Sequence, residues 1–210
     1  MSEATIRAVL FDYGGVIAEE GFYNGLADLA EKQSLRVSDM PEEGMKAAYD
    51  SGFVLGHGMA ADFWALLRRR TGLQGSDDFL TDQILIGFQI RRWVIELVRQ
   101  LRSKGYVVGI LSDQTHWLNE LDSRDHFYHE FDHVYNSYDL GKGKRDPSLF
   151  TDVVNRLKLQ PAEVLFIDDN ENNVQTARKA GLTAIRYRDQ EHLLFQLEDL
   201  LKKPVIKKHQ

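Results

Sequence analysis

Residues 8–15 read Ala-Val-Leu-Phe-Asp-Tyr-Gly-Gly, and this stretch decides the fold class because an apolar run leads directly into a carboxylate and two glycines. A short, unbroken apolar run bounded by glycine is typical of a buried strand in a parallel sheet. Such sheets bind ligands at the carboxyl ends of their strands, where this stretch places Asp12. The glycine pair allows a sharp turn and lets backbone N–H groups approach an anion. From this stretch alone, a capping role for Asp12 fits the pattern equally well.

Apolar runs and helical periodicities alternate through the remainder of the chain. The apolar positions of residues 93–104 follow helical spacing, and Gly105 suits the position just after that helix. Further strands are expected at residues 106–111, 133–135, 164–167 and 183–186. Strands that alternate with helices form right-handed βαβ units. The sequence therefore predicts the α/β class, with a Rossmann-like parallel sheet core and helices on both faces.

A region of different character separates the first strand from the rest of the predicted sheet. It has apolar residues at helical spacing, punctuated by glycines, and no strand-like apolar run. We expect residues 18–89 to form a small all-helical cap domain inserted after the first strand. Residues 1–17 and 90–210 then form the Rossmann-like core domain.

Composition excludes several classes of function. The chain has 210 residues, a net charge of −6 and no cysteine, so thiolate nucleophiles, thiolate metal sites and disulfides are absent. The net charge and the lack of a basic stripe argue against nucleic-acid binding. No apolar stretch is long enough to cross a membrane, and no signal peptide is recognisable. We expect a cytoplasmic protein that binds neither nucleic acid nor membrane, and the pattern predicts no particular oligomeric state.

Polar side chains follow three of the predicted strands, and a lysine stands in a glycine-rich loop. Asp12 ends the first strand, Ser112 the second, and Asp168 and Asp169 the fourth, while Lys144 lies between glycine and proline residues. Converging carboxylates repel each other unless a cation joins them, and Mg²⁺ is the first candidate for oxygen ligands. A hydroxyl, backbone N–H groups and an ammonium group suit a phosphate. A carboxylate nucleophile beside Mg²⁺ is the arrangement for an aspartyl-phosphate intermediate.

In these residues the chain resembles the haloacid dehalogenase-like hydrolase superfamily, in the subgroup with a helical cap after the first strand. The resemblance covers residues 7–186. Its four motifs, in order, are Phe-Asp-Tyr-Gly-Gly-Val at 11–16, Leu-Ser-Asp at 111–113, Lys144 within 140–147, and Phe-Ile-Asp-Asp-Asn-Glu-Asn-Asn at 166–173. Their order and spacing together make a specific signal, although each motif alone is weak.

The resemblance implies a role for each matching residue. Asp12 is implied to be the nucleophile and a metal ligand, Ser112 to bind a phosphoryl oxygen, and Lys144 to stabilise the transition state electrostatically. These are the expected catalytic residues. Asp113 and Gly15 are expected to join Ser112 and Lys144 in binding substrate. The implied metal ligands are Asp12, the carbonyl oxygen of Gly14, Asp169 directly, and Asp168 directly or through water. Asn173 is implied to orient the acidic loop.

One departure from the family pattern removes a catalytic group. Most phosphatases of this superfamily carry an acid–base Asp two residues after the nucleophile, where this chain has Gly14. General acid–base catalysis contributes about 10²–10⁴-fold. Glu19 and Glu20 could substitute, but we expect both to be solvated acids of the linker. Sugar-phosphate phosphatases with glycine at this position exist in the same superfamily and resemble the chain from end to end.

Two further departures concern the phosphate side of the site. Asp113 stands where asparagine is usual, and its charge is unfavourable near a phosphate unless it is paired or turned away. Arg145 replaces a proline after Lys144, which loosens that loop and adds a candidate contact for an anion.

These patterns favour a Mg²⁺-dependent phosphatase that hydrolyses a small phosphorylated metabolite, a sugar phosphate or a nucleotide, through an aspartyl-phosphate intermediate. A 2-haloacid dehalogenase is an alternative that uses the same carboxylate, but it gains nothing from the acidic pair at 168–169. A non-catalytic ligand-binding protein of the same fold is a second alternative, which Gly14 and Asp113 favour.

Overall fold

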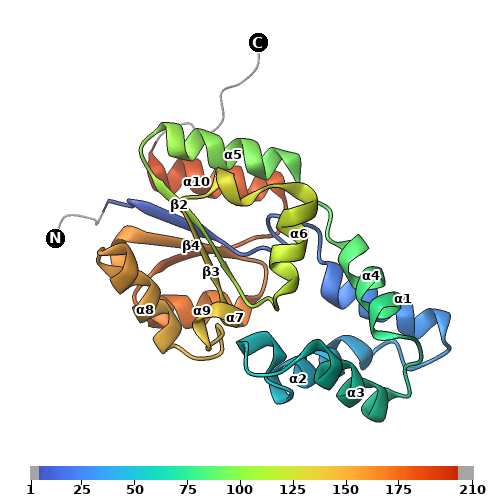
Figure 1. Ribbon diagram of the computed structural model, residues 1–210. Coiled ribbons are helices and arrows are strands. Elements are labelled where there is room, and N and C mark those ends of the chain that lie inside the picture. The colour runs from blue at the N-terminus through green and yellow to red at the C-terminus, as the bar shows by residue number, and fades with distance from the viewer. Residues whose placement is uncertain (1–4, 203–210) are drawn as a thin grey trace.

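A computed structural model describes residues 5–202 and shows a five-stranded sheet with helices on both faces (Figure 1). Neighbouring strands are all parallel, in the order β3-β2-β1-β4-β5. The strands are β1 (Ala8–Phe11), β2 (Val107–Ser112), β3 (His133–Asn136), β4 (Val164–Asp168) and β5 (Thr183–Arg186). The predicted α/β class is confirmed, and each strand lies within two residues of its predicted position.

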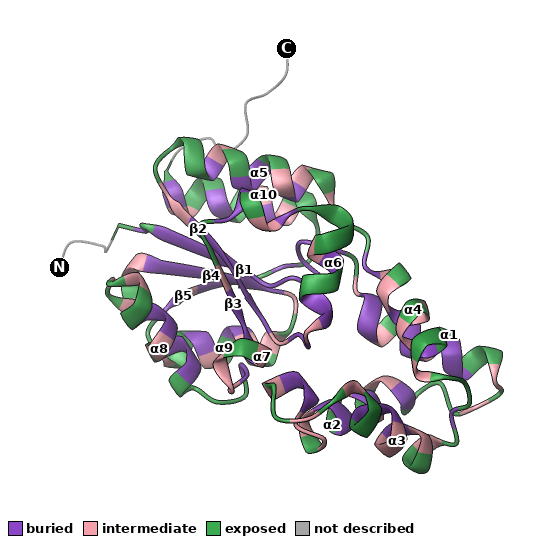
Figure 2. Cartoon of the chain, viewed as in Figure 1, coloured by how far each residue is buried: buried purple, intermediate pink, exposed green. Residues whose placement is uncertain are grey.

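Side chains of the central strand alternate between two apolar cores. Val9 and Phe11 belong to a large cluster on one face, while Ala8 and Leu10 belong to a second cluster on the other. The first face is covered by α5 (Arg92–Ser103), α6 (Trp117–Asp125) and α10 (Gln190–Leu201). The second face is covered by α8 (Ser148–Leu157) and α9 (Glu171–Lys179). Burial on both faces explains why the strands read as continuous apolar runs (Figure 2).

The register brings the ends of the three central strands together. Phe11 is level with Ile110 of β2 and with Ile167 of β4. The N–H of Asp12 then donates to the carbonyl oxygen of Ile167 at 2.9 Å, so the pairing extends as far as the carboxylate. The residues that follow these strands therefore emerge at one edge of the sheet.

Four helices between β1 and α5 pack against one another, to one side of the sheet (Figure 1). They are α1 (Gly21–Lys32), α2 (Met40–Asp50), α3 (Ala60–Thr71) and α4 (Asp77–Gly87), joined in part by the 3₁₀ turn η1 (Phe53–Leu55). Glycines allow close packing here: a Cβ atom on Gly44 would overlap the side chain of Leu26. The assignment of residues 18–89 as a separate domain stays a prediction.

Short elements complete the described chain. They are η2 (Tyr128–Glu130), α7 (Ser137–Leu140) and η3 (Pro161–Glu163). The guanidinium group of Arg91 donates to the carbonyl oxygens of Val16 and Ala18. These hydrogen bonds join the segment that leaves the sheet after β1 to the segment that leads back to it before α5. Within residues 5–202, every helix is too short or too polar to traverse a lipid bilayer.

Candidate active site

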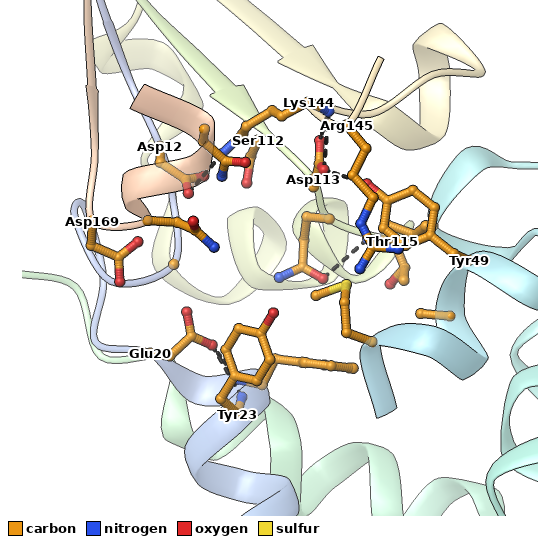
Figure 3. Close-up of a pocket in the computed structure, with 18 of the residues that line it drawn as sticks. Asp12, Glu20, Tyr23, Tyr49, Ser112, Asp113, Thr115, Lys144, Arg145 and Asp169 are labelled. Atoms are coloured by element: carbon orange, nitrogen blue, oxygen red, sulfur yellow. Dashed lines mark hydrogen bonds and ion pairs between the residues drawn. The ribbon is translucent and has the colours of Figure 1, made fainter. Parts of the chain in front are cut away.

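Asp12 stands directly after β1 at the centre of the sheet edge. Its side chain is held from both sides, because the N–H of Tyr13 donates to Oδ1 at 2.7 Å and Lys144 Nζ lies 2.7 Å from Oδ2. The residue is only 9% exposed, and that exposure faces a pocket. The carboxylate is therefore fixed in one orientation at the wall of the pocket (Figure 3).

Lys144 is buried between two carboxylates. Its ammonium group lies 2.7 Å from both Asp12 Oδ2 and Asp168 Oδ2, and the residue is 1% exposed. Burial alone would lower the pKa of Lys144, but the two carboxylates raise it above its ordinary value. The lysine is therefore a fixed positive charge beside Asp12.

Three carboxylates converge beside Lys144, the one ammonium group that pairs with any of them within residues 5–202. Oxygens of Asp12, Asp168 and Asp169 all lie within 4.8 Å of one another. Burial raises the pKa of Asp12 above its ordinary value, the neighbouring acids add to the rise, and Lys144 opposes it. Burial and Asp168 also raise the pKa of Asp169. A cation bound to these oxygens would favour their ionised forms, so the donor set fits a hard divalent ion.

Asp168, the last residue of β4, and Asp169, which follows it, differ in how firmly their side chains are held. Asp168 is fully buried and accepts hydrogen bonds from the N–H of Asn170 at 2.8 Å and from Asn173 Nδ2 at 3.1 and 3.2 Å, besides its pair with Lys144. Asp169 has no such hydrogen-bond donors among the described side chains and lines the pocket. This contrast supports Asp169 as the direct ligand and Asp168 as the acid held in place by Asn173.

The glycine pair after Asp12 shapes the same site. Gly15 has a φ of +77°, and a Cβ atom there would lie 2.3 Å from Asp169 Oδ2. Only glycine therefore lets the turn pass so close to the acidic residue. Gly14 lines the pocket, so its backbone is available there.

On the opposite side of Asp12, Ser112 ends β2 and Asp113 follows it, and both line the pocket. Ser112 is 3% exposed. Asp113 accepts two hydrogen bonds from the N–H of Lys144, at 2.9 and 3.1 Å, and one at 2.5 Å from the hydroxyl group of Tyr49. The charge that sequence reasoning found unfavourable is thus paired with donors, one of them from helix α2. Tyr49 itself was missed, because nothing in the sequence places α2 opposite β2.

Glu20 contradicts the expectation of a solvated linker acid. Its Oε1 accepts hydrogen bonds from the N–H groups of Phe22 and Tyr23, at 3.0 and 3.1 Å, which caps α1 and draws the carboxyl group inward. A Cβ atom on Gly14 would lie 2.9 Å from Glu20 Oε2, so the carboxyl group fills space beside that glycine. Burial raises the pKa of Glu20 to about 7. Glu19 is exposed and pairs with Arg91, as expected of a linker acid.

The pocket over these residues is closed by the helical region. It has a volume of about 120 Å³, which suits a small ligand. Tyr23 and Tyr49 reach into it from α1 and α2 in Figure 3. Ser137 Oγ donates to the carbonyl oxygen of Val54 at 2.7 Å, a further link between sheet and helices. The structure thus brings together every residue predicted for the site: Asp12, Gly14, Gly15, Ser112, Asp113, Lys144, Asp168 and Asp169.

Comparison with known proteins adds evidence that is independent of this geometry. The sequence profile of the haloacid dehalogenase-like hydrolases matches residues 6–181. D-ribitol-5-phosphate phosphatase of Bacteroides thetaiotaomicron is 24% identical over 84% of this chain and 89% of its own length. Rat bifunctional epoxide hydrolase 2 is 30% identical over 55% of this chain, which spans only 22% of that protein.

Solved structures share the fold. One is a HAD family enzyme of Bacteroides thetaiotaomicron in complex with magnesium and inorganic phosphate, with a TM-score of 0.69 at 24% identity, covering 90% of this chain and 98% of its own. The L-2-haloacid dehalogenase of Xanthobacter autotrophicus has a TM-score of 0.66 at 19% identity, covering 93% of this chain and 83% of its own. Likeness of fold alone does not separate the two chemistries, so the side chains at the site must do so.

Proposed function

The chain belongs to the haloacid dehalogenase-like hydrolases, and we propose that within this family it is a Mg²⁺-dependent phosphatase acting on a small phosphorylated metabolite. The observation that carries the proposal is the convergence of Asp12, Asp168 and Asp169 beside the buried Lys144, next to a small pocket. A halide-displacing carboxylate needs no cation and gains nothing from two further acids beside it. The similarity to D-ribitol-5-phosphate phosphatase, and to a HAD family enzyme solved with magnesium and inorganic phosphate, supports the same choice.

Asp12 and Asp169 would hold the Mg²⁺ ion, with the carbonyl oxygen of Gly14 and with Asp168 directly or through water. When bound, the ion neutralises charge on the phosphoryl group and on the nucleophile. Asn173 and Lys144 fix Asp168, so the acidic loop is held in place before any ligand binds.

Asp12 is the proposed nucleophile. One of its oxygens attacks the phosphorus atom, and the bond from phosphorus to the alcohol oxygen breaks. Ser112 donates a hydrogen bond to a phosphoryl oxygen, and Lys144 compensates the negative charge that develops. Water then attacks the phosphorus atom of the aspartyl phosphate, which releases inorganic phosphate and restores the carboxylate. Asp113 and Gly15 complete the phosphate-binding wall.

The leaving alcohol needs a proton, and Glu20 is the proposed donor. Its carboxyl group lies beside Gly14. Gly14 stands two residues after the nucleophile, where most phosphatases of the family carry an acid. Glu20 would give its proton to the leaving oxygen and take one from the attacking water in the second step, so the proton balance closes over one cycle. The helical region at 18–89 is proposed to act as the cap domain that supplies this acid and selects the substrate.

Release of phosphate from a panel of phosphate monoesters tests the proposal. With Mg²⁺ present we expect turnover that is lost in Asp12→Asn and after chelation with EDTA, and retained in Asp78→Asn, an exposed acid of α4. Halide release from a 2-haloacid without metal would instead indicate a dehalogenase. Stabilisation by Mg²⁺ and phosphate without turnover of any ester would indicate a binding protein.

A further inference from the structure

Arg145 lines the pocket where the core meets helix α2 of the helical region. It directly follows Lys144 in the chain, and its guanidinium carbon lies 3.9 Å from the ring centroid of Tyr49 on α2 (Figure 3). The side chain lines the pocket and is exposed to solvent. A guanidinium group that stacks by its face keeps the N–H donors at its edge available for a planar anion.

The two cations that line the pocket differ in their partners. Lys144 is paired with Asp12 and Asp168, and it belongs to the catalytic centre. Arg145 forms neither an ion pair nor a hydrogen bond with any residue in the described range 5–202. A positive charge without a carboxylate partner, at the lining of a pocket, is a place where a negative group of a ligand is favoured.

Asp113 forms no ion pair with Arg145, and both of its carboxylate oxygens accept hydrogen bonds from other groups. Oδ1 and Oδ2 accept from the N–H of Lys144, and Oδ2 accepts from the Tyr49 hydroxyl group. That last hydrogen bond also fixes the Tyr49 ring against which the guanidinium group stacks. The arginine is thus positioned before a ligand arrives, which lowers the entropic cost of binding.

We propose that Arg145 is a specificity-determining residue that binds a second anionic group of the substrate, in addition to the phosphate at Asp12. The inference rests on the proposed phosphatase function and deepens it. The substrate class is a small phosphate monoester with a second anion, either a carboxylate or a second phosphate, at the end away from the scissile bond. Esters of the same size with an uncharged end are poorer substrates.

Pairs of esters that differ only in this second charge test the proposal. 3-Phosphoglycerate is compared with glycerol 3-phosphate for the carboxylate, and fructose 1,6-bisphosphate with fructose 6-phosphate for the second phosphate. For at least one pair, we expect kcat/KM to favour the member with the second anionic group by about 10-fold or more, mainly through KM, since charge-assisted bidentate contacts are the strong ones. The pair that shows the preference identifies the second anion.

Three variants assign the preference to Arg145. Arg145→Gln is expected to remove it while changing turnover of the member that lacks the second anion less than about threefold. Arg145→Lys keeps the charge but not the planar fork, so it retains part of the preference. Arg69→Gln on the exposed surface of α3 is the matched control and leaves the preference intact. No preference in the wild type, or a preference that survives Arg145→Gln, would overturn the proposal.

A binding measurement separates this inference from the proposed function. Calorimetric titration of the Asp12→Asn protein with the same pairs, with and without Arg145→Gln, needs no turnover. Tighter binding of the member with the second anionic group, dependent on Arg145, supports the second site even if no ester is hydrolysed. Equal binding of both members of each pair refutes the second site even if phosphate release confirms a phosphatase.

Discussion

Replacement of Glu20 by Gln gives a sharp test of how this site manages without an acid at Gly14. In an aspartate, bond lengths put the carboxylate oxygen roughly 2.4 Å from its own Cβ atom. Glu20 Oε2 lies 2.9 Å from the position of a Cβ atom on Gly14. The Glu20 oxygen is therefore at a distance comparable to that of an aspartate oxygen at position 14, on a side chain that comes from the helical region.

Loss of a general acid costs about 10²–10⁴-fold in rate, or about 3–5 kcal/mol of barrier. We expect Glu20→Gln to lose that factor in kcat/KM with an alkyl phosphate. With p-nitrophenyl phosphate the loss should be within about threefold, because nitrophenolate leaves without a proton. Glutamine keeps an oxygen that can cap α1, so the melting temperature should change little.

The pH profile has a defined sign. Burial raises the pKa of Glu20 to about 7, so the carboxyl group carries its proton below that pH and loses it above. Wild-type kcat/KM for the alkyl ester should therefore fall as the pH rises through 7, and this limb should be absent in Glu20→Gln. Glu19→Gln, in the neighbouring exposed acid, is the control and should keep the wild-type profile.

A double variant tests whether an acid at position 14 can replace Glu20. Glu20→Ala removes the carboxyl group that a side chain at position 14 would meet, and Gly14→Asp then supplies an acid from the core. We expect Gly14→Asp with Glu20→Ala to recover a large part of the activity lost in Glu20→Ala alone. Equal losses with the alkyl and nitrophenyl esters in Glu20→Gln, or no loss with either, would show that Glu20 only caps α1.

Four further outcomes are expected. Gly15→Ala should weaken Mg²⁺ binding by about 10- to 100-fold, because its Cβ atom would lie 2.3 Å from Asp169 Oδ2; titrating the melting temperature with Mg²⁺ measures this. Lys144→Gln should lower the free energy of unfolding in urea by about 3–5 kcal/mol, since it leaves buried carboxylates without their partner. Tyr49→Phe should lower it by about 1–3 kcal/mol through loss of the bond to Asp113, and an unchanged urea midpoint would contradict that. Phosphate release that persists in excess EDTA would contradict the magnesium site.

Sequence alone located the parts of the site that lie next to strands. A parallel sheet buried on both faces produces continuous apolar runs, so β1 and β4 could be found by inspection, and Asp12 and Asp168 with them. Parallel strands end at the same edge of a sheet, so the sequence is enough to predict that these acids lie together. The spacing of apolar residues likewise predicts the helical character of residues 18–89.

Only the tertiary structure decided which side chains from the helical region complete the pocket. Glu20 reads as one more charged residue of a linker, and Tyr49 as one aromatic residue of an amphipathic helix. Their roles depend on how α1 and α2 sit over the sheet edge, a packing between elements distant in sequence that no local periodicity encodes. The physical reason is that periodicity reports which face of an element is buried, whereas the partner against which it is buried is set by the whole chain.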